Sequence, residues 1–325
     1  MKSFQYHRPT DTQSALDLFQ KNEGAQYIAG ATNLLDLMKK DVMAPDHLID
    51  ISRLPLNEIE NSSLGVTIGA LALNSDVAID EIITEQYPLV AQALLAGASP
   101  QLRNMATVGG NILQRTRCPY FYDIAMPCNK RQPGSGCGAK SGFNRMSAIF
   151  GASDDCVAVH PSDLCVALAA LDAKITVKSA KQERIIDFKD FHRLPGNTPE
   201  KDNILEKGEL ITSITIPKNN FTKYYNYMKV RDRASYAFAL VSVAVALDIK
   251  DSVIVDARIA LGGVAHKPWR AYEAEAYLKG KSDSENSFKN AAAIVVKEAK
   301  PLTHNAFKVK MAEQTVLAAM LSIFN

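Results

Sequence analysis

The strongest constraint on the fold is a period-two pattern of apolar residues in the last third of the chain. Apolar side chains occupy every second position over residues 241–249 and again over 253–261. This period matches the alternating faces of a β-strand, and residues 250–252 between the two runs are few enough for a hairpin turn. Apolar stripes over 285–300 and 305–324 predict two helices that can cover one face of the hairpin. The pattern therefore predicts an antiparallel sheet packed against C-terminal helices.

The earlier part of the chain predicts a mixture of strands and helices. Residues 26–29 have a strand pattern and residues 34–38 a helical one, with a short loop between them. A further strand is expected at 66–70, and helices are expected over 75–96. The composition becomes richer in strand-forming residues after Pro217, where we place a domain boundary.

Charge and hydropathy argue against several classes of partner. The chain has 37 Lys and Arg against 35 Asp and Glu, a formal charge of +2 spread along the sequence, so nucleic acid is a poor candidate partner. The most apolar run, 238–247, is shorter than the ~20 residues of a membrane-spanning helix, so no membrane partner is expected. The first residues lack a basic end followed by an apolar core. We therefore expect no signal peptide of its own, and folding in the cytoplasm.

The cysteines are confined to one stretch of the chain. They are Cys118, Cys128, Cys137, Cys156 and Cys165. Residues 111–149 show neither helical nor strand periodicity, and loops of that length inside a domain are usually functional or disordered. In a reducing compartment a metal or cluster site explains four of the thiols better than disulfides do. Their C-x9-C-x8-C-x18-C spacing matches neither a ferredoxin nor a zinc ribbon, but four thiolates suit a cubane cluster. We expect Cys165 to be a core residue of a helix over 162–173.

Two glycine-containing loops could bring the backbone close to a ligand. The first is Ala29-Gly30-Ala31-Thr32-Asn33-Leu34, which could bind an anion or could be an ordinary strand-to-helix turn. The second spans 103–111, where Thr107 and Asn111 bracket Gly109 and Gly110, and it could wrap a pyrophosphate or form a hairpin turn. Neither loop has the G-x-G-x-x-G dinucleotide fingerprint, so a nicotinamide-binding Rossmann domain is not expected.

Taken together, several segments resemble the FAD-binding subunit of the molybdenum hydroxylases, the family of xanthine dehydrogenase and carbon monoxide dehydrogenase. They are the first loop and residues 102–111, 161–164 and 261–270, which occur in the family's order. The resemblance covers essentially the whole chain. It implies an α+β fold: an FAD-binding domain of two small α/β subdomains (PCMH/VAO-like) over 1–217, then a C-terminal domain over 218–325 with an antiparallel sheet covered by helices.

The resemblance also implies a set of flavin contacts. Residues Ala29 to Leu34 and Thr107 to Asn111 would hold the FAD pyrophosphate, and Asp163 would bond the ribityl chain. Ile211 and Lys229 would line the isoalloxazine or adenine side. Ile211 could equally be a strand core residue, and Lys229 a solvated charge at the end of a strand.

The chain departs from most of that family by an insertion at about 112–160, which carries Cys118, Cys128, Cys137 and Cys156. A flavin subunit with this insertion resembles those of the periplasmic aldehyde oxidoreductases and of 4-hydroxybenzoyl-CoA reductase, in which the inserted loop binds a [4Fe-4S] cluster. The phrases at 114–121 and 134–139 favour the aldehyde oxidoreductases. The four cysteines are therefore the expected cluster ligands.

The implied function is an electron-transfer subunit of a heteromeric molybdenum aldehyde oxidoreductase. Electrons would come from a large molybdenum-cofactor subunit and a small subunit with two [2Fe-2S] clusters, pass through FAD and [4Fe-4S] here, and leave to an external acceptor. The resemblance implies periplasmic export with a partner that bears a twin-arginine signal. No catalytic residue is expected, since His160 and His192 have no carboxylate or nucleophile at a telling spacing. The alternatives are a flavin subunit of an aromatic acyl-CoA reductase and a metal-stapled binding module without flavin.

Overall fold

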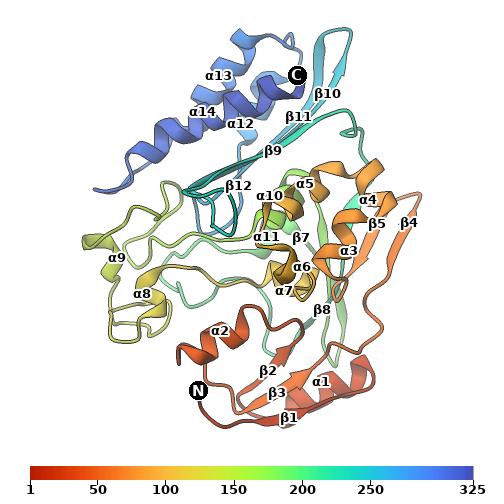
Figure 1. Ribbon diagram of the computed structural model, residues 1–325, viewed down its shortest axis with the longest axis vertical. Helices are drawn as coiled ribbons and strands as arrows, with labels where there is room; N and C mark the ends of the chain where they lie inside the picture. The colour runs from red at the N-terminus through yellow and green to blue at the C-terminus, as the bar shows by residue number, and fades with distance from the viewer. Residues whose placement is uncertain (325) are drawn as a thin grey trace.

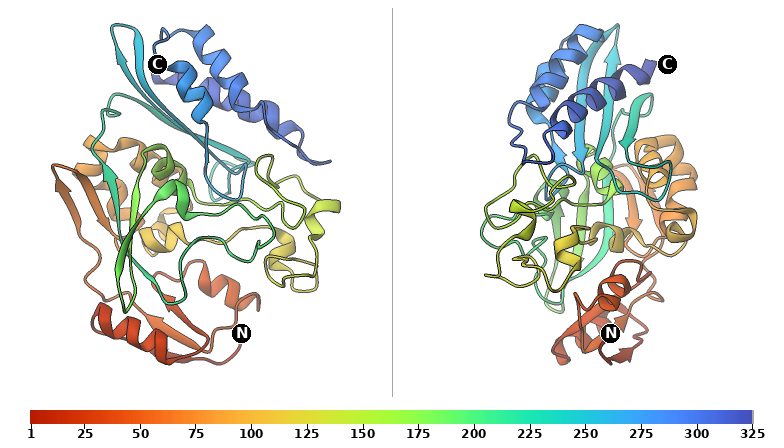
Figure 2. Two further views of the ribbon diagram at one scale, coloured as in Figure 1. Left: turned by 180° about the vertical axis from the view of Figure 1, so that it is seen from behind. Right: turned by 60° about the vertical axis from the view of Figure 1, so that its left-hand side comes forward.

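Three sheets follow one another along the long axis of the molecule, in a computed structural model that describes residues 1–324 (Figure 1). The first residues form the sheet at one end, and the last residues cover the sheet at the other end (Figures 1 and 2). The predicted α+β class is confirmed. Among the described residues, no helix has both the length and the apolar character needed to cross a membrane.

A parallel sheet of three short strands, in the order β1-β3-β2, forms the N-terminal end. Its strands are β1 (Gln5–His7), β2 (Ala25–Ile28) and β3 (His47–Asp50), and its helices are α1 (Thr12–Lys21) and α2 (Leu34–Lys39). Asp11 caps α1 by accepting a hydrogen bond from the backbone N–H of Ser14 at 2.8 Å. The strand, loop and helix predicted around the first glycine loop are confirmed as β2, the loop and α2.

The middle sheet is antiparallel, in the order β4-β5-β8-β6-β7. Its strands are β4 (Ile59–Ser62), β5 (Gly65–Gly69), β6 (Lys174–Lys178), β7 (Glu183–Asp187) and β8 (Leu210–Pro217). The helices around it are α3 (Asn74–Ile79), α4 (Glu81–Gln86), α5 (Pro88–Ala96), α6 (Pro100–Arg103), α7 (Val108–Ile112), α10 (Asp163–Ala170) and α11 (Phe188–Phe191). The sequence pattern did not give the bounds of β8, which lies at the centre of this sheet, although Ile211 was considered as a strand core residue.

The C-terminal sheet is antiparallel, in the order β12-β11-β10-β9. Its strands are β9 (Tyr224–Val230), β10 (Val241–Lys250), β11 (Val253–Gly262) and β12 (Trp269–Arg270). Its helices are α12 (Tyr272–Leu278), α13 (Glu285–Val295) and α14 (Phe307–Leu321), followed by the 3-10 turn Ser322–Phe324. The predicted hairpin is confirmed. Its turn residues Asp251 and Ser252 have φ of 50° and 58°. Positive φ at both positions is typical of a two-residue hairpin turn whose twist matches that of the strands. Pro217 ends β8, and the domain boundary there stays a prediction.

Helix α10 joins the middle sheet to the C-terminal sheet, and all of its residues are buried. One face of the C-terminal sheet contributes Ala244, Ala246 and Ala260 to the core around α10, while the other face packs against the C-terminal helices. The contact is close, because a Cβ added at Gly262 would lie 2.6 Å from a methyl of Val166. The small residues of the alternating pattern therefore let α10 approach the sheet.

The cysteine-bearing segment between α7 and α10 is held by hydrogen bonds and contains two short helices, α8 (Pro119–Tyr122) and α9 (Gly138–Ser141). It lies at one side of the molecule, between α2 and α14 (Figures 1 and 2). Lys308 of α14 donates to the carbonyl oxygens of Ser147 at 3.0 Å and Gly263 at 2.5 Å, and burial lowers the pKa of Lys308 to about 7. The C-terminal helix thus fixes the end of this segment.

Candidate cofactor sites

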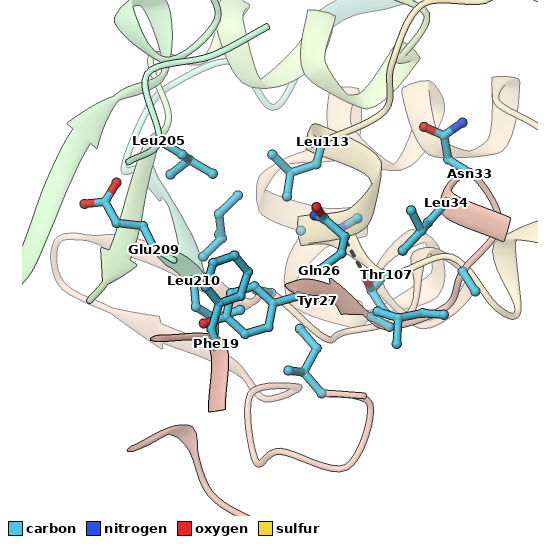
Figure 3. A pocket seen from close by; sticks show the side chains of 18 of the residues that line it. Phe19, Gln26, Tyr27, Asn33, Leu34, Thr107, Leu113, Leu205, Glu209 and Leu210 are labelled. Atoms are coloured by element: carbon cyan, nitrogen blue, oxygen red, sulfur yellow. Dashed lines mark hydrogen bonds between the residues drawn. The ribbon is translucent and has the colours of Figure 1, made fainter. Parts of the chain in front are cut away.

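The first glycine loop, residues 29–34, lines a cavity of about 710 Å³, which we call the first cavity. Its other walls come from β2, α7 and the chain from Asp202 to Ile211. Figure 3 labels, among the lining side chains, Phe19, Tyr27, Asn33, Leu34, Thr107 and Leu210. A cavity of this volume is in the range of small-molecule and cofactor sites.

The backbone N–H groups of the first loop are available to donate hydrogen bonds to a ligand. Within residues 1–324, no N–H group from Gly30 to Asn33 makes a hydrogen bond. Ala31 has a left-handed φ of 61°, and turns of that kind can gather successive amides around an anion. Gly30 packs against the chain before the second loop so closely that an added Cβ would lie 1.7 Å from the carbonyl oxygen of Met105. The buried amide nitrogen of Asn33 also has no partner among the described residues.

The second glycine loop is the start of helix α7, so the hairpin turn considered as its alternative is wrong. Thr107 is the N-cap and accepts a hydrogen bond from the N–H of Gly110 at 3.2 Å. The N–H groups of Val108 and Gly109 donate to the carbonyl oxygens of Ala72 and Ala70 at 2.9 and 2.8 Å. These amides are therefore already bonded within the protein.

A second cavity of about 780 Å³ adjoins the first, and the two share Thr32, Ala106 and Gly110 in their walls. Of the predicted residues, Asn111, Asp163 and Lys229 line the second cavity and not the first, whereas Ile211 lines the first and not the second. The structure thus brings all the predicted flavin contacts except Val108 to one of two joined cavities. This arrangement suits an extended ligand that crosses the point where the glycine loops meet.

Asp163 is held at the wall of the second cavity by two partners. The Nζ of Lys229 donates to one carboxylate oxygen at 2.7 Å, and the hydroxyl of Tyr227 donates to the other at 2.7 Å. The Lys229 side chain is only 4% exposed, so the alternative of a solvated strand-end charge is wrong. Burial, together with the neighbouring Asp163 charge, raises the pKa of Tyr227 well above its usual value. Tyr227 had no sequence signal, because its role depends on the pairing of β9 beside α10.

Ile211 is a strand core residue, and its contact with the flavin stays a prediction. It belongs to β8, is 4% exposed in the middle core, and also lines the first cavity.

Four of the cysteines share the walls of one very small space, which we call the cysteine cage. Its lining thiols are Cys118, Cys128, Cys137 and Cys156. Cys128 and Cys137 face each other as an antiparallel β-bridge. The interaction between the thiols of Cys156 and Cys137 lowers the pKa of Cys137 and raises that of Cys156. Burial raises the pKa of Cys118 to about 11.

Cys165 lies outside the cage, fully buried in α10, where burial raises its pKa to about 12. Its sulfur and the nearest ring nitrogens of His160 and His192 lie within 4.8 Å of one another. Burial lowers the pKa of His192 to about 4 and that of His160 well below its usual value, so both imidazoles are neutral. The Nε2 of His192 lies 3.0 Å from the carbonyl oxygen of Ile112, which orients the ring.

A further cavity of about 170 Å³, which we call the central cavity, lies between the cage and the second cavity. Cys118 and Ala139 line both it and the cage. Phe238, Ser162 and Asp163 line both it and the second cavity. The wall of the central cavity is mostly apolar, with the charged groups of Arg117 and Asp163 among its lining residues.

Comparisons with known proteins agree with this geometry. The family model described as the FAD binding domain in molybdopterin dehydrogenase matches residues 2–219, and the CO dehydrogenase flavoprotein C-terminal domain matches residues 223–323. The chain is 47% identical to the aldehyde oxidoreductase FAD-binding subunit PaoB of Escherichia coli (strain K12), covering 98% of each chain. It is 31% identical to the glyceraldehyde dehydrogenase medium chain of Sulfolobus acidocaldarius, covering 92% of this chain and 89% of that one.

A solved structure has the same fold over nearly its whole length. It is the carbon monoxide dehydrogenase from Hydrogenophaga pseudoflava that lacks the Mo-pyranopterin moiety of the molybdenum cofactor. The TM-score is 0.77 at 25% sequence identity, over 99% of this chain and 97% of that chain. The chain therefore belongs to the FAD-binding subunit family of the molybdenum hydroxylases and is an oxidoreductase subunit.

Proposed function

We propose that this chain is the FAD and [4Fe-4S] electron-transfer subunit of a heteromeric molybdenum aldehyde oxidoreductase. Its partners would be a large molybdenum-cofactor subunit and a small subunit with [2Fe-2S] clusters, and its electrons would leave to an external acceptor. The similarity over the whole chain to a subunit named as part of an aldehyde oxidoreductase supports the substrate class.

The two joined cavities fit FAD. Four consecutive unbonded N–H groups, 30–33, are the donor set that a pyrophosphate needs, and Gly110 leaves the shared wall without a side chain. Asp163, fixed by Lys229 and Tyr227, places a carboxylate where the ribityl hydroxyls would lie in the second cavity. These contacts support placing the pyrophosphate at the shared wall.

The cysteine cage fits a cubane cluster by its donor set. Four thiols line one space, which is the number and chemical softness that an iron–sulfur cubane requires. The opposite pKa shifts of Cys137 and Cys156, each caused by the other thiol, support a shared site for their sulfurs. Metal binding would replace the protons on these sulfurs, so cluster assembly would release protons.

The single observation that carries the proposal is the continuity of the two sites. Cys118 lines the cage and the central cavity, and Asp163 lines the central cavity and the second cavity. One small apolar space therefore separates the thiols from the flavin site. A short separation between the cluster site and the flavin site favours electron transfer between them. A binding module without redox cofactors would not need it.

The chain's own residues hold and insulate the cofactors. FAD would supply exchange between electron pairs and single electrons, and the cluster would supply single-electron transfer. The residues of the first loop would donate to the pyrophosphate, Asp163 would accept from the ribityl chain, and Phe238 and Ala239 would exclude water from the central cavity. No residue of this chain is assigned to aldehyde oxidation.

The test is anaerobic addition of an aldehyde to the heteromeric complex and to this chain alone, followed by absorbance of the flavin. We expect rapid flavin reduction in the complex and none in the isolated chain. Flavin reduction by the isolated chain, without molybdenum, would contradict the proposal.

The cluster ligands are tested by iron analysis of matched variants of the complex. Cys137→Ser should lower the bound iron, whereas Cys165→Ser should leave it unchanged, because Cys165 lies outside the cage. Iron that survives Cys156→Ser but is lost with Cys165→Ser would show that the ligand assignment is wrong.

A further inference from the structure

A buried ammonium group forms part of the cysteine cage. Lys130 lines the cage together with the four cysteines, and its side chain is 1% exposed. Its Nζ donates to a carboxylate oxygen of Asp202 at 2.5 Å and to the carbonyl oxygen of Pro199 at 2.7 Å. Burial of a cation is costly unless it is paired, so these contacts hold a charged group beside the thiols.

Asp202 connects Lys130 to the first glycine loop. Its other oxygen accepts a hydrogen bond from the Nε of Arg115 at 2.7 Å, and the backbone N–H of Arg115 donates to Asn33 at 2.9 Å. Asp202 and Arg115 both line the first cavity. One chain of contacts thus runs from the cage to the loop proposed to hold the pyrophosphate.

The carboxyl group of Asp202 is ionised near neutral pH. Burial alone would raise the pKa of Asp202, but the neighbouring Lys130 and Arg115 cations hold it at about 2. The nearby His266 is neutral, because burial and the Lys130 charge lower its pKa to about 3. Two cations and one carboxylate therefore leave a net positive charge, with Lys130 at the cage itself.

We propose that Lys130 sets the reduction potential of the cluster in the cysteine cage through its fixed positive charge, and that Asp202 partly offsets it. This inference rests on the proposed function, which places the cluster on the four cysteines. Reduction brings one electron from the partner's iron–sulfur centre, with no bond made or broken and no proton taken up. The added negative charge is stabilised by a nearby cation in a poorly solvated interior, so Lys130 raises the potential and Asp202 lowers it.

The experiment is a redox titration of the complete complex, followed by electron paramagnetic resonance of the cluster. Lys130→Met removes the charge and keeps most of the side-chain volume, and it should shift the potential downward. Asp202→Asn should shift it upward, because the two cations lose their counter-charge. Lys130→Arg should keep the potential close to that of the unmodified complex.

Lys140→Met is the matched control. Lys140 lies three residues after Cys137. Its Nζ forms an ion pair with a carboxylate oxygen of Asp154 at 2.5 Å. Its side chain is 46% exposed and that of Asp154 is 96% exposed, so solvent screens this pair. We expect a much smaller shift than with Lys130→Met.

The outcomes separate the two proposals. A complex without iron and inorganic sulfide overturns the proposed function. A complex with the cluster, in which Lys130→Met and Asp202→Asn shift the potential in the same direction or not at all, overturns this inference alone. If Lys130→Met loses its iron, the upward shift in Asp202→Asn decides the question, since a merely structural role predicts less cluster at an unchanged potential.

Discussion

The two glycine loops line the same cavity but use their backbones in opposite ways. In the first loop, the N–H groups of residues 30–33 make no hydrogen bond within residues 1–324, and Ala31 is left-handed. In the second loop, the N–H groups of residues 108–110 are all bonded to oxygens of the protein itself. The first loop also depends on close packing against Met105, whereas a Cβ at Gly110 would meet only Thr107 within 4 Å.

The sequence assigned pyrophosphate binding to both loops together. The difference between their backbones indicates that the two loops have different tasks. The first loop offers donors, so we expect it to make the main hydrogen bonds to the pyrophosphate. The second loop offers a firm wall without a side chain, so we expect it to set how closely the ligand can approach. Each prediction below tests one side of this comparison.

The largest expected effect comes from Asp163, which follows the residue that supports the second loop. Ser162 donates to Asn111 at 2.6 Å, and the next residue, Asp163, neutralises the buried Lys229. Asp163→Ala leaves that cation unpaired, so we expect a loss of about 3–5 kcal/mol in the free energy of unfolding. Chemical denaturation measures it. The double variant with Lys229→Met should recover part of the loss, and simple additivity of the two changes would contradict the assigned pair.

The next effect tests the packing of the first loop. Gly30→Ala places a Cβ 1.7 Å from the Met105 carbonyl oxygen and must push the two chain segments apart. We expect a loss of about 2–3 kcal/mol in stability and little bound FAD. Thermal unfolding and flavin content measure the two effects. Normal flavin content in this variant would show that the contact between the segments is unimportant.

A smaller effect should appear at the second loop. Gly110→Ala adds a Cβ whose nearest atom is the Thr107 hydroxyl at 3.0 Å, so the fold should tolerate it. Because Gly110 lines both cavities, we expect FAD to bind about tenfold more weakly, near 1.4 kcal/mol, with little change in stability. Fluorescence titration of the flavin-free protein measures the affinity. Unchanged affinity would remove this wall from the flavin site.

The last prediction is a pH dependence on the side of the first loop. The pKa of Asp202 falls from 3.8 to about 2 on folding, so its ionised form stabilises the fold above 3.8, and this contribution is lost as the pH falls toward 2. Acid should therefore loosen Arg115 and, through it, Asn33. Asp202→Asn should be less stable at neutral pH and show a shallower loss across this range. An unchanged acid profile in unfolding experiments would contradict the assigned contact.

Local pattern predicted the parts of the fold that local forces decide. The β10–β11 hairpin follows from strict alternation and a short turn, and Pro88 begins α5 as its fixed φ favours. The central position of strand β8 was not predicted, because its neighbours β5 and β6 come from distant parts of the chain. Its place depends on pairing that no local pattern records.

The same distinction applies to the candidate site, where residue types could be predicted from the sequence but long-range contacts could not. The glycine loops and the four cysteines could be named from residue type, order and the resemblance. The contacts of Lys130, Arg115 and Tyr227 could not, since Lys130 and Asp202 are 72 positions apart and Tyr227 and Asp163 are 64 apart. Only the packing of the cysteine-bearing segment against the chain near Asp202 brings the first pair together.

The central claim is that one chain holds FAD where the glycine loops meet and a cubane cluster on four cysteines. The most direct test is to purify the chain anaerobically, release its flavin by heat, identify it by chromatography, and assay iron and inorganic sulfide in the same sample. The account predicts non-covalent FAD and one [4Fe-4S] cluster per chain. Recovery of FMN or a covalent flavin, or zinc in place of iron and sulfide, would contradict it.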